Sequence, residues 1–159
     1  MSRMARITQW ILEVQAESDQ KPIDGDLKEK NIWVWGPPGT GKSRWAHQLP
    51  GTKYMKLSNK WWDGYNGQPI VIMEDLDLQL AQHLKLWADR YVFTAEVKGG
   101  HRPIRPDFNL VVTSNYHPDS CFTNPEDAAA IRRRFTICHV AMEGAEPQWV
   151  PIRVEEVGR

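Results

Sequence analysis

The sequence predicts an α/β fold with a parallel sheet flanked by helices, on three observations. Apolar runs within 31–35, 70–75 and 109–115 lack the alternation of a half-exposed strand, so each is expected to be a strand buried on both faces. Segments with apolar residues at helical spacing, such as 76–90, separate these runs. A glycine-rich loop follows the first run and precedes a helix predicted over 42–48, which is the order that a phosphate-binding loop requires.

The loop has the pattern of a glycine, four further residues and then Gly-Lys-Ser. Its glycines leave room for backbone N–H groups to converge on phosphates. Lys42 is expected to place a positive charge on those phosphates, Ser43 offers a hydroxyl to Mg²⁺, and the following helix adds the positive end of its dipole. The candidate nucleotide-binding residues are Gly36, Pro37, Pro38, Gly39, Thr40, Gly41, Lys42 and Ser43.

The composition limits the partners and the compartment of this 159-residue chain. Its 20 basic and 20 acidic residues cancel, so nucleic-acid binding would need a local patch or patches summed in an oligomer. Cys121 and Cys138 are the only cysteines and have no zinc spacing, which indicates a reducing compartment and thiols that are either buried or incidental. No apolar run approaches a membrane span and no signal peptide opens the chain, so we expect a soluble protein.

A short amphipathic helix is predicted over 3–15, with Ile7, Trp10, Ile11 and Val14 on its apolar face. A helix of this length is marginal alone, so we expect it to pack against its own domain or a neighbouring subunit. The predicted organisation is an N-terminal helix segment at 1–20, a linker at 21–30, a central domain at 31–142 and a C-terminal extension at 143–159.

Polar side chains follow two of the predicted buried strands. Glu74 and Asp75 end the run at 70–75, and Asn115 ends the run at 109–115. Because ligands of open α/β sheets bind beyond the carboxyl ends of the strands, we expect these side chains to lie together. The carboxylates are then placed to hold Mg²⁺ and polarise an attacking water, and the amide to orient that water or contact a γ phosphate. The alternative is that the two acidic residues have no functional role, because acidic residues often end strands at the solvent-exposed surface.

A basic hairpin is predicted after the helix at 76–90, whose Leu80, Leu84 and Trp87 are expected to face the core. Residues 92–97 alternate as a strand, and 98–102 form a tight reversal. The reversal carries Lys98, His101 and Arg102, which either contact a nucleic-acid backbone or form a solvated turn. Upstream, a shorter strand is predicted at 53–57 and an aromatic turn at 60–67, with Asn66-Gly67 as its reversal.

A second candidate site lies at the C-terminal end of a helix predicted to begin at Pro125. That helix begins with an Asn124 cap and Pro125, ends at Arg132-Arg133-Arg134 and precedes a strand predicted at 135–140. The arginines either complement the helix dipole or supply an arginine finger to the γ phosphate in a neighbouring subunit.

These segments together resemble a known family. The order GPPGTGKS, KWWDGYNGQPIVIMED, YVFTAEVKGGHRP, LVVTSN and AIRRRF is similar to the superfamily 3 helicase domain of replication-associated (Rep) proteins from circular single-stranded DNA viruses, especially the circovirus-like group. The resemblance covers 31–140, and its WWDGY and VKGG elements are more specific than the phosphate loop. It implies an AAA+-type fold and a ring, expected to be a hexamer, that binds ATP between subunits and moves along single-stranded DNA.

The resemblance also implies individual roles. Residues 36–43 would bind ATP and Mg²⁺, Glu74 and Asp75 would be the metal-site and catalytic carboxylates, and Asn115 the sensor. Lys98, with His101 as a second candidate and Arg102 beside it, would contact DNA. Arg133 or Arg134 would be the finger, and the helix at 3–15 resembles an oligomerisation segment. The implied function is the ATP-dependent DNA helicase domain of a viral rolling-circle replication initiator, in the host nucleus if the virus infects a eukaryote.

The sequence departs from the family where a nicking endonuclease would be expected. It has no pair of histidines two residues apart and no tyrosine followed three residues later by lysine. We therefore expect no nicking activity and a chain that is part of a longer Rep. Two other functions are open: an RNA helicase of the same superfamily, and a nucleotide-dependent assembly module with little unwinding.

Overall fold

The computed structural model describes residues 2–10, 20–143 and 146–148. Its centre is a five-stranded sheet in the order β2-β3-β6-β1-β7, and all its neighbouring strands run parallel. The strands are β1 (Asn31–Trp35), β2 (Lys53–Met55), β3 (Ile70–Glu74), β6 (Asn109–Ser114) and β7 (Thr136–His139). The α/β fold with a parallel sheet is therefore confirmed. β1 and β3 are largely buried because their apolar side chains pack on both faces.

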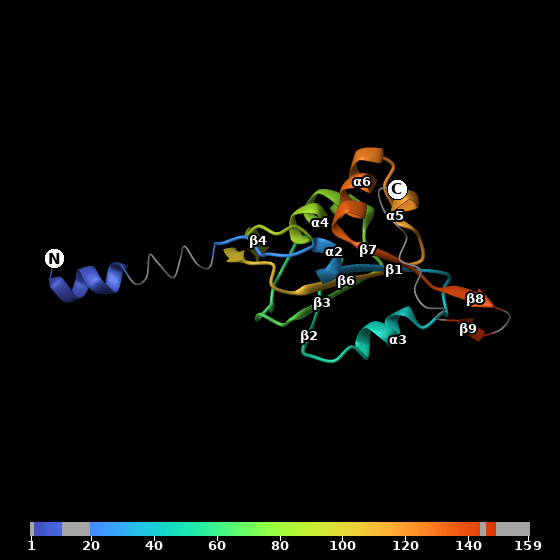
Figure 1. Ribbon diagram of the computed structural model, residues 1–159, viewed down its shortest axis with the longest axis horizontal. Coiled ribbons are helices and arrows are strands. Elements are labelled where there is room, and N and C mark those ends of the chain that lie inside the picture. Colours follow the sequence, from blue (N-terminus) through green and yellow to red (C-terminus); the bar gives the residue numbers. More distant parts are fainter. Residues whose placement is uncertain (1, 11–19, 144–145, 149–159) are drawn as a thin grey trace.

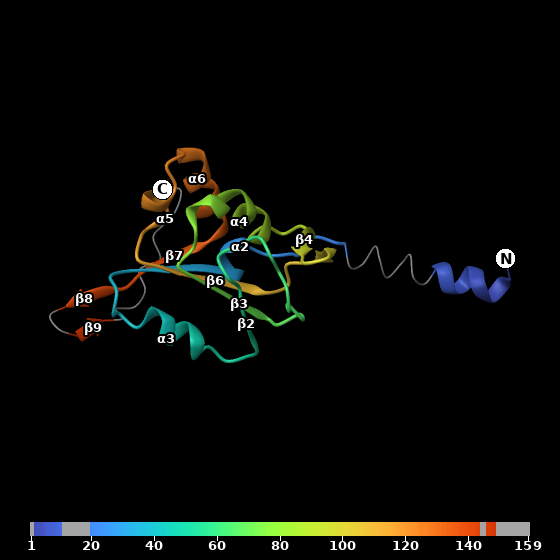
Figure 2. The same ribbon diagram turned by 180° about the vertical axis from the view of Figure 1, so that it is seen from behind.

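Helices cover the two faces of this sheet unequally. Helix α3 lies on one face, and α4, α5 and α6 gather on the other (Figure 1 and, from behind, Figure 2). These helices are α3 (Lys42–His47), α4 (Ala81–Trp87), α5 (Pro118–Cys121) and α6 (Pro125–Arg134). The larger core, which includes Leu84 and Ile131, lies on the side of α4 and α6. A smaller cluster of Ala46, Ile72 and Val111 lies under α3.

Local contacts correct three predicted boundaries. The helix predicted over 76–90 is a 3₁₀ turn, η1 (Leu78–Leu80), followed by α4, because Asp77 caps the segment by accepting the Gln79 N–H at 3.0 Å. Leu80, Leu84 and Trp87 are nevertheless buried, as expected. Strand β2 ends at Met55, two residues early. The Asn66-Gly67 reversal is wrong: the chain turns at Asp63-Gly64, where the Tyr65 N–H donates to the Trp62 carbonyl at 3.1 Å.

The ends of the chain are described in part. Residues 3–10 are helical and leave Met4, Ile7 and Trp10 exposed, whereas Ile11 and Val14 lie outside the described residues. The predicted linker contains a short helix, α2 (Leu27–Lys30), whose Lys28 carbonyl accepts from the Thr136 hydroxyl at 2.6 Å. β8 (Ala141–Glu143) and β9 (Glu146–Gln148) pair antiparallel after β7. Within the described ranges no helix is long and apolar enough to cross a membrane.

A separate hairpin, β4 (Phe93–Val97) and β5 (Gly100–Ile104), is fixed to the domain through Trp62. This side chain is fully buried. Its ring lies 5.3 to 5.8 Å, between centroids, from those of five aromatic residues: Tyr54, Tyr65, Trp87, Phe93 and Phe108. Trp62 thus joins β2, α4, the hairpin and the chain before β6 into one aromatic cluster.

Replacing Trp62 with alanine should lower the free energy of unfolding by about 3 to 5 kcal/mol, because it leaves a large cavity among rings that cannot all collapse into it. Trp61→Ala is the matched control. Trp61 is only half-buried, so its loss should cost less than about 2 kcal/mol. Urea denaturation followed by circular dichroism measures both values. If both variants lose the same free energy of unfolding, Trp62 is not the centre of the aromatic cluster.

Candidate nucleotide-binding site

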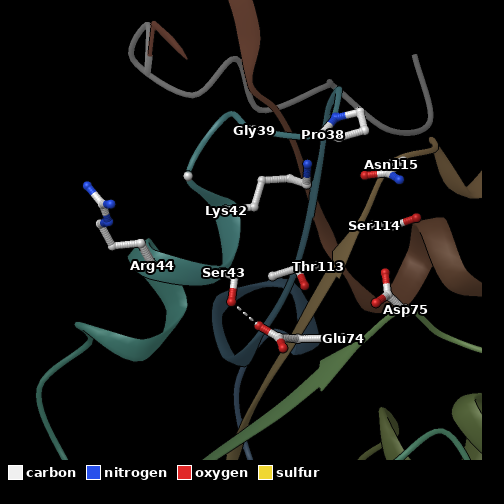
Figure 3. A pocket seen from close by; sticks show the side chains of 11 residues that line it. Pro38, Gly39, Lys42, Ser43, Arg44, Glu74, Asp75, Thr113, Ser114 and Asn115 are labelled. Carbon is white, nitrogen blue, oxygen red and sulfur yellow. Dashed lines mark hydrogen bonds between the residues drawn. The ribbon is translucent and has the colours of Figure 1, made fainter.

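The candidate site is a pocket at the carboxyl edge of the central sheet. Trp35 of β1 pairs with Ser114 of β6, and Glu74 of β3 pairs with Thr113 of β6, so these strands end side by side. The segments that follow them enclose a pocket of about 740 Å³. Its lining residues are Pro38, Gly39, Gly41, Lys42, Ser43, Arg44, Glu74, Asp75, Thr113, Ser114 and Asn115. The structure thus brings the loop, both carboxylates and Asn115 together (Figure 3).

Two glycines of the loop are required for different reasons. Gly36 lies against the end of β7, where a Cβ atom would stand 2.2 Å from the Val140 carbonyl oxygen, so no side chain fits. Gly41 has a φ of 84° and caps helix α3 in the left-handed conformation that side chains disfavour. The loop conformation therefore depends on these residues even before any phosphate binds.

Lys42 points back across its own loop. Its side chain lies among neutral oxygens, donating to the carbonyls of Gly36 and Pro37, both at 2.8 Å, and to the Thr40 hydroxyl at 3.2 Å. Burial lowers the pKa of Lys42, and the nearby charge of Asp75 opposes that shift. A phosphate could take the place of these neutral partners and add an opposite charge, which gives a buried ammonium group a stronger partner.

Glu74 is held toward helix α3. Its Oε1 accepts a hydrogen bond from Ser43 Oγ at 2.5 Å and lies 3.4 Å from His47 Nε2. Ser43 and His47 are one helical turn apart and so lie on one face of α3. His47 was not among the predicted site residues, although its spacing from Ser43 along the predicted helix was the available signal.

Asp75 lies on the other side of the pocket from Ser43. Figure 3 shows Glu74 directed at Ser43, whereas Asp75 lies near Ser114 and Asn115. The φ of Asp75 is 51°, which makes it the non-glycine residue with a positive φ in the described part of the chain. Asp is among the few side chains that tolerate this left-handed conformation. The turn that Asp75 makes directs the two consecutive carboxylates to different parts of the pocket.

The oxygen donors of this pocket fit Mg²⁺. A hydroxyl from Ser43 and carboxylates from Glu74 and Asp75 are hard ligands of the kind that Mg²⁺ prefers. Mg²⁺ takes few ligands from protein and the rest from water and phosphate oxygens, so a nucleotide site does not need a dense cluster of protein ligands. The described residues contain no group of three or more His, Cys, Asp or Glu side chains arranged for a metal ion.

The two candidate finger arginines have different surroundings. Arg134 is fixed within its own domain, where it donates to the carbonyls of Lys85 and Ala130 at 3.1 and 2.9 Å and pairs with Asp89 at 3.0 Å. Arg133 is exposed, and within the described ranges its side chain makes no hydrogen bond or ion pair. Of these two arginines, Arg133 is therefore the one whose guanidinium group is available to another molecule.

The hairpin residues are also separated by the structure. Lys98 is exposed in the turn. In the register of the hairpin, His101 is opposite Glu96 and Arg102 is opposite Ala95, so the two basic side chains lie on opposite faces. Arg102 donates to the Tyr65 carbonyl at 2.5 Å and lies against the Tyr65 ring. Lys98, His101 and Arg102 thus do not form one basic surface, and Arg102 fastens the hairpin to the domain.

The parallel sheet, the glycine loop and the carboxylates beyond β3 define a P-loop-type α/β domain. Comparison with known proteins narrows this class. Residues 32–90 match the family described as RNA helicase. Over 113 residues the chain is 39% identical to the replication-associated protein of beak and feather disease virus, a match that covers 70% of this chain and 38% of that protein.

Two further matches extend the comparison. The replication-associated protein of porcine circovirus 1 is 34% identical over 148 residues, covering 89% of this chain and 46% of that protein. The genome polyprotein of human klassevirus 1 is 36% identical over 58 residues, covering 28% of this chain and 2% of the polyprotein. The matches to the two replication-associated proteins span less than half of their length. The chain contains a Rep-like superfamily 3 helicase domain.

Proposed function

We propose that this chain is the ATP-dependent DNA helicase domain of a viral replication initiator and acts as a ring on single-stranded DNA. The observation that carries the proposal is the pocket in which Lys42, Ser43, Glu74, Asp75 and Asn115 meet at the carboxyl edge of the sheet. We take residues 31–142 as the ATPase domain, with the helix before it as the oligomerisation segment. By the resemblance to Rep proteins, we place the protein in the host nucleus if the parent virus infects a eukaryote.

The chemistry of this pocket follows from where its side chains lie. Lys42 places its charge on the β and γ phosphates of ATP, while the loop amides bind the same oxygens. Ser43 and Glu74, which are hydrogen-bonded to each other, would hold Mg²⁺, and the ion would supply positive charge that neutralises the phosphates. Asp75 accepts a proton from the attacking water, and the Asn115 amide orients that water.

The position of Arg133 supports sites that lie between subunits. Arg133 precedes β7, and Thr136 at the start of β7 pairs with Ile32 at the start of β1. The phosphate loop follows Trp35, so it lies beyond the other end of these strands, roughly 10 Å further along at the usual rise per residue. Arg133 therefore lies near the amino edge of the sheet, away from the pocket of its own chain, which leaves it available to serve a neighbour's.

A ring also accounts for DNA binding by a neutral chain. The formal net charge is zero, so an isolated subunit has no general attraction for DNA. Lys98, exposed in the hairpin turn, would be repeated by every subunit around a pore and form a positive lining. His101 is also exposed on this hairpin and is the second candidate for a DNA contact.

Lys98→Ala should weaken binding to single-stranded DNA, remove the DNA-dependent increase in ATP hydrolysis and reduce the salt dependence of binding, because it deletes one phosphate contact from every subunit. Lys53→Ala is the matched control, since Lys53 lies on β2 outside the hairpin. Fluorescence anisotropy with a labelled oligonucleotide over a salt series measures the effect. If both variants bind with the salt dependence of the wild type, Lys98 is not the DNA contact.

RNA helicase activity is the second candidate function, because the matching family is described as RNA helicase and one match is a viral genome polyprotein. Competition between single-stranded DNA and RNA of the same sequence separates the two candidates. The DNA proposal predicts that DNA displaces a bound labelled strand at lower concentration than RNA. Tighter binding and stronger stimulation of hydrolysis by RNA would favour the second candidate instead.

A further inference from the structure

The Trp-Trp-Asp-Gly-Tyr motif at 61–65 has no part in the proposed chemistry, although it is among the most specific parts of the sequence. Its first three residues belong to residues 58–63, which we call the strap. The strap has one end at the backbone of Glu74 and Asp75, where β3 ends, and the other at the turn of the β4–β5 hairpin. The strap therefore lies between the candidate ATP site and the candidate DNA contact.

The first end of the strap is bonded to the backbone of the catalytic carboxylates. The Ser58 hydroxyl is 2.9 Å from the Asp75 carbonyl oxygen and 3.3 Å from that of Glu74, and it donates toward them. Asp75 is the residue in the left-handed conformation, so this hydroxyl bonds to the backbone at an unusual turn. Any rotation of the Glu74-Asp75 backbone must move or break the bonds to Ser58.

The second end of the strap is bonded to the hairpin. The Trp62 N–H donates to the Glu96 carbonyl at 2.9 Å, alongside a bridge between Trp61 and Glu96. Asp63 Oδ1 accepts the backbone N–H of Lys98 at 2.9 Å. The carboxylate of Asp63 thus bonds to the main chain of the residue whose side chain is proposed to contact DNA. A hydrogen bond to a charged acceptor is among the stronger ones available to an exposed turn.

The middle of the strap is restrained by hydrogen bonds and by the burial of Trp62. The Trp61 N–H donates to Asn59 Oδ1 at 3.0 Å, and the buried Lys56 ammonium donates to the carbonyl oxygens of Leu57 and Asn59 just before and within the strap. Trp62 is fixed in the aromatic cluster. A short segment with these internal bonds transmits a displacement from one end to the other better than a free loop would.

We propose that the strap positions the Lys98 turn and couples it to the carboxylates after β3, with Asp63 and Ser58 as its positioning residues. The proposal rests on the proposed function, since it assigns a role to the connection between the ATP pocket and the DNA contact. When nucleotide binding moves the backbone of Glu74 and Asp75, Ser58 carries the movement into the strap, and Asp63 carries it to the hairpin.

Hydrolysis assays test this coupling with conservative variants as controls. Asp63→Ala and Ser58→Ala should lose most of the stimulation by single-stranded DNA that the wild type has, while the rate without DNA stays within about twofold. Asp63→Asn and Ser58→Thr keep an acceptor and a hydroxyl, so they should retain the stimulation. If the alanine variants respond to DNA as the wild type does, the strap does not couple the sites. If the wild type itself shows no stimulation by DNA, the proposed function fails. The role of the strap is then tested by hydrogen exchange, which needs no DNA.

Hydrogen exchange measured by mass spectrometry tests the coupling through the strap in the absence of DNA. Asp63→Ala should speed exchange in peptides containing Lys98 on the order of tenfold, from the loss of one hydrogen bond to a charged acceptor, and Asp63→Asn, which keeps a neutral acceptor, should speed it clearly less. A non-hydrolysable ATP analogue with Mg²⁺ should alter exchange in the hairpin of the wild type and leave that of Ser58→Ala unchanged. The same response in Ser58→Ala, or no response in the wild type, would overturn the proposal.

Discussion

Arg133→Ala should reduce ATP hydrolysis by roughly 10³ to 10⁵ while ATP affinity stays within about twofold, as expected for loss of an arginine finger. The reason is positional: Arg133 is exposed, lies near the edge of the sheet opposite the pocket of its own chain, and has no hydrogen-bond or ion-pair partner among the described residues. Steady-state hydrolysis and binding of a fluorescent ATP analogue measure the two quantities separately.

Arg134→Ala is the matched control for this prediction. Its guanidinium group bonds to the carbonyls of Lys85 and Ala130 and to Asp89, so its loss should destabilise the fold by about 2 to 4 kcal/mol by leaving those groups without their partner. Arg133→Ala should leave the melting temperature unchanged. If Arg133→Ala hydrolyses ATP at the wild-type rate, or melts at as low a temperature as Arg134→Ala, Arg133 is not the arginine finger.

Mixing two inactive variants tests whether Arg133 acts between subunits. Lys42→Ala lacks a functional loop but retains Arg133, and Arg133→Ala has the opposite defect. Where they assemble together, some interfaces join an intact loop to an intact arginine, so hydrolysis should return in the mixture. A mixture as inactive as its components would mean that the arginine does not serve a neighbouring site.

Asp75→Asn should lower kcat by roughly 10² to 10⁴ and leave Mg²⁺-dependent ATP binding intact, because an amide cannot accept the proton of the attacking water. Glu74→Gln should instead weaken the Mg²⁺ dependence of binding, because Glu74 is the carboxylate that is hydrogen-bonded to Ser43. The measurements are single-turnover hydrolysis and ATP binding across a Mg²⁺ series. The reverse pattern would exchange the roles of the two residues.

The central sheet and the pocket could be predicted because both follow from local pattern. Strands that are buried on both faces must be apolar throughout, so 70–75 and 109–115 were recognisable, and the order of strand, loop and helix fixed the edge where polar residues meet. The different directions of the Glu74 and Asp75 carboxylates were not predictable, because they depend on the left-handed backbone of Asp75.

Other features depend on contacts that no short stretch of sequence contains. Arg133 and Arg134 are adjacent on one helix, and only the position of α4 decides which is bonded inside the domain. The turn at Asp63-Gly64 prevails over Asn66-Gly67 because Trp62 is buried and Asp63 bonds to the hairpin. The placement of Arg102 on the same face as Phe93 and Ala95, by contrast, could have been predicted by continuing their alternation through the turn.

Steady-state ATP hydrolysis at low salt, with and without single-stranded DNA, tests the central claim most directly. The wild-type chain is compared with Lys42→Ala over a range of protein concentrations. The account predicts a rate that rises with DNA, increases faster than linearly with protein because sites form between subunits, and disappears in Lys42→Ala. A rate that depends on Lys42 but is unaffected by DNA and strictly proportional to protein would contradict a ring-forming helicase.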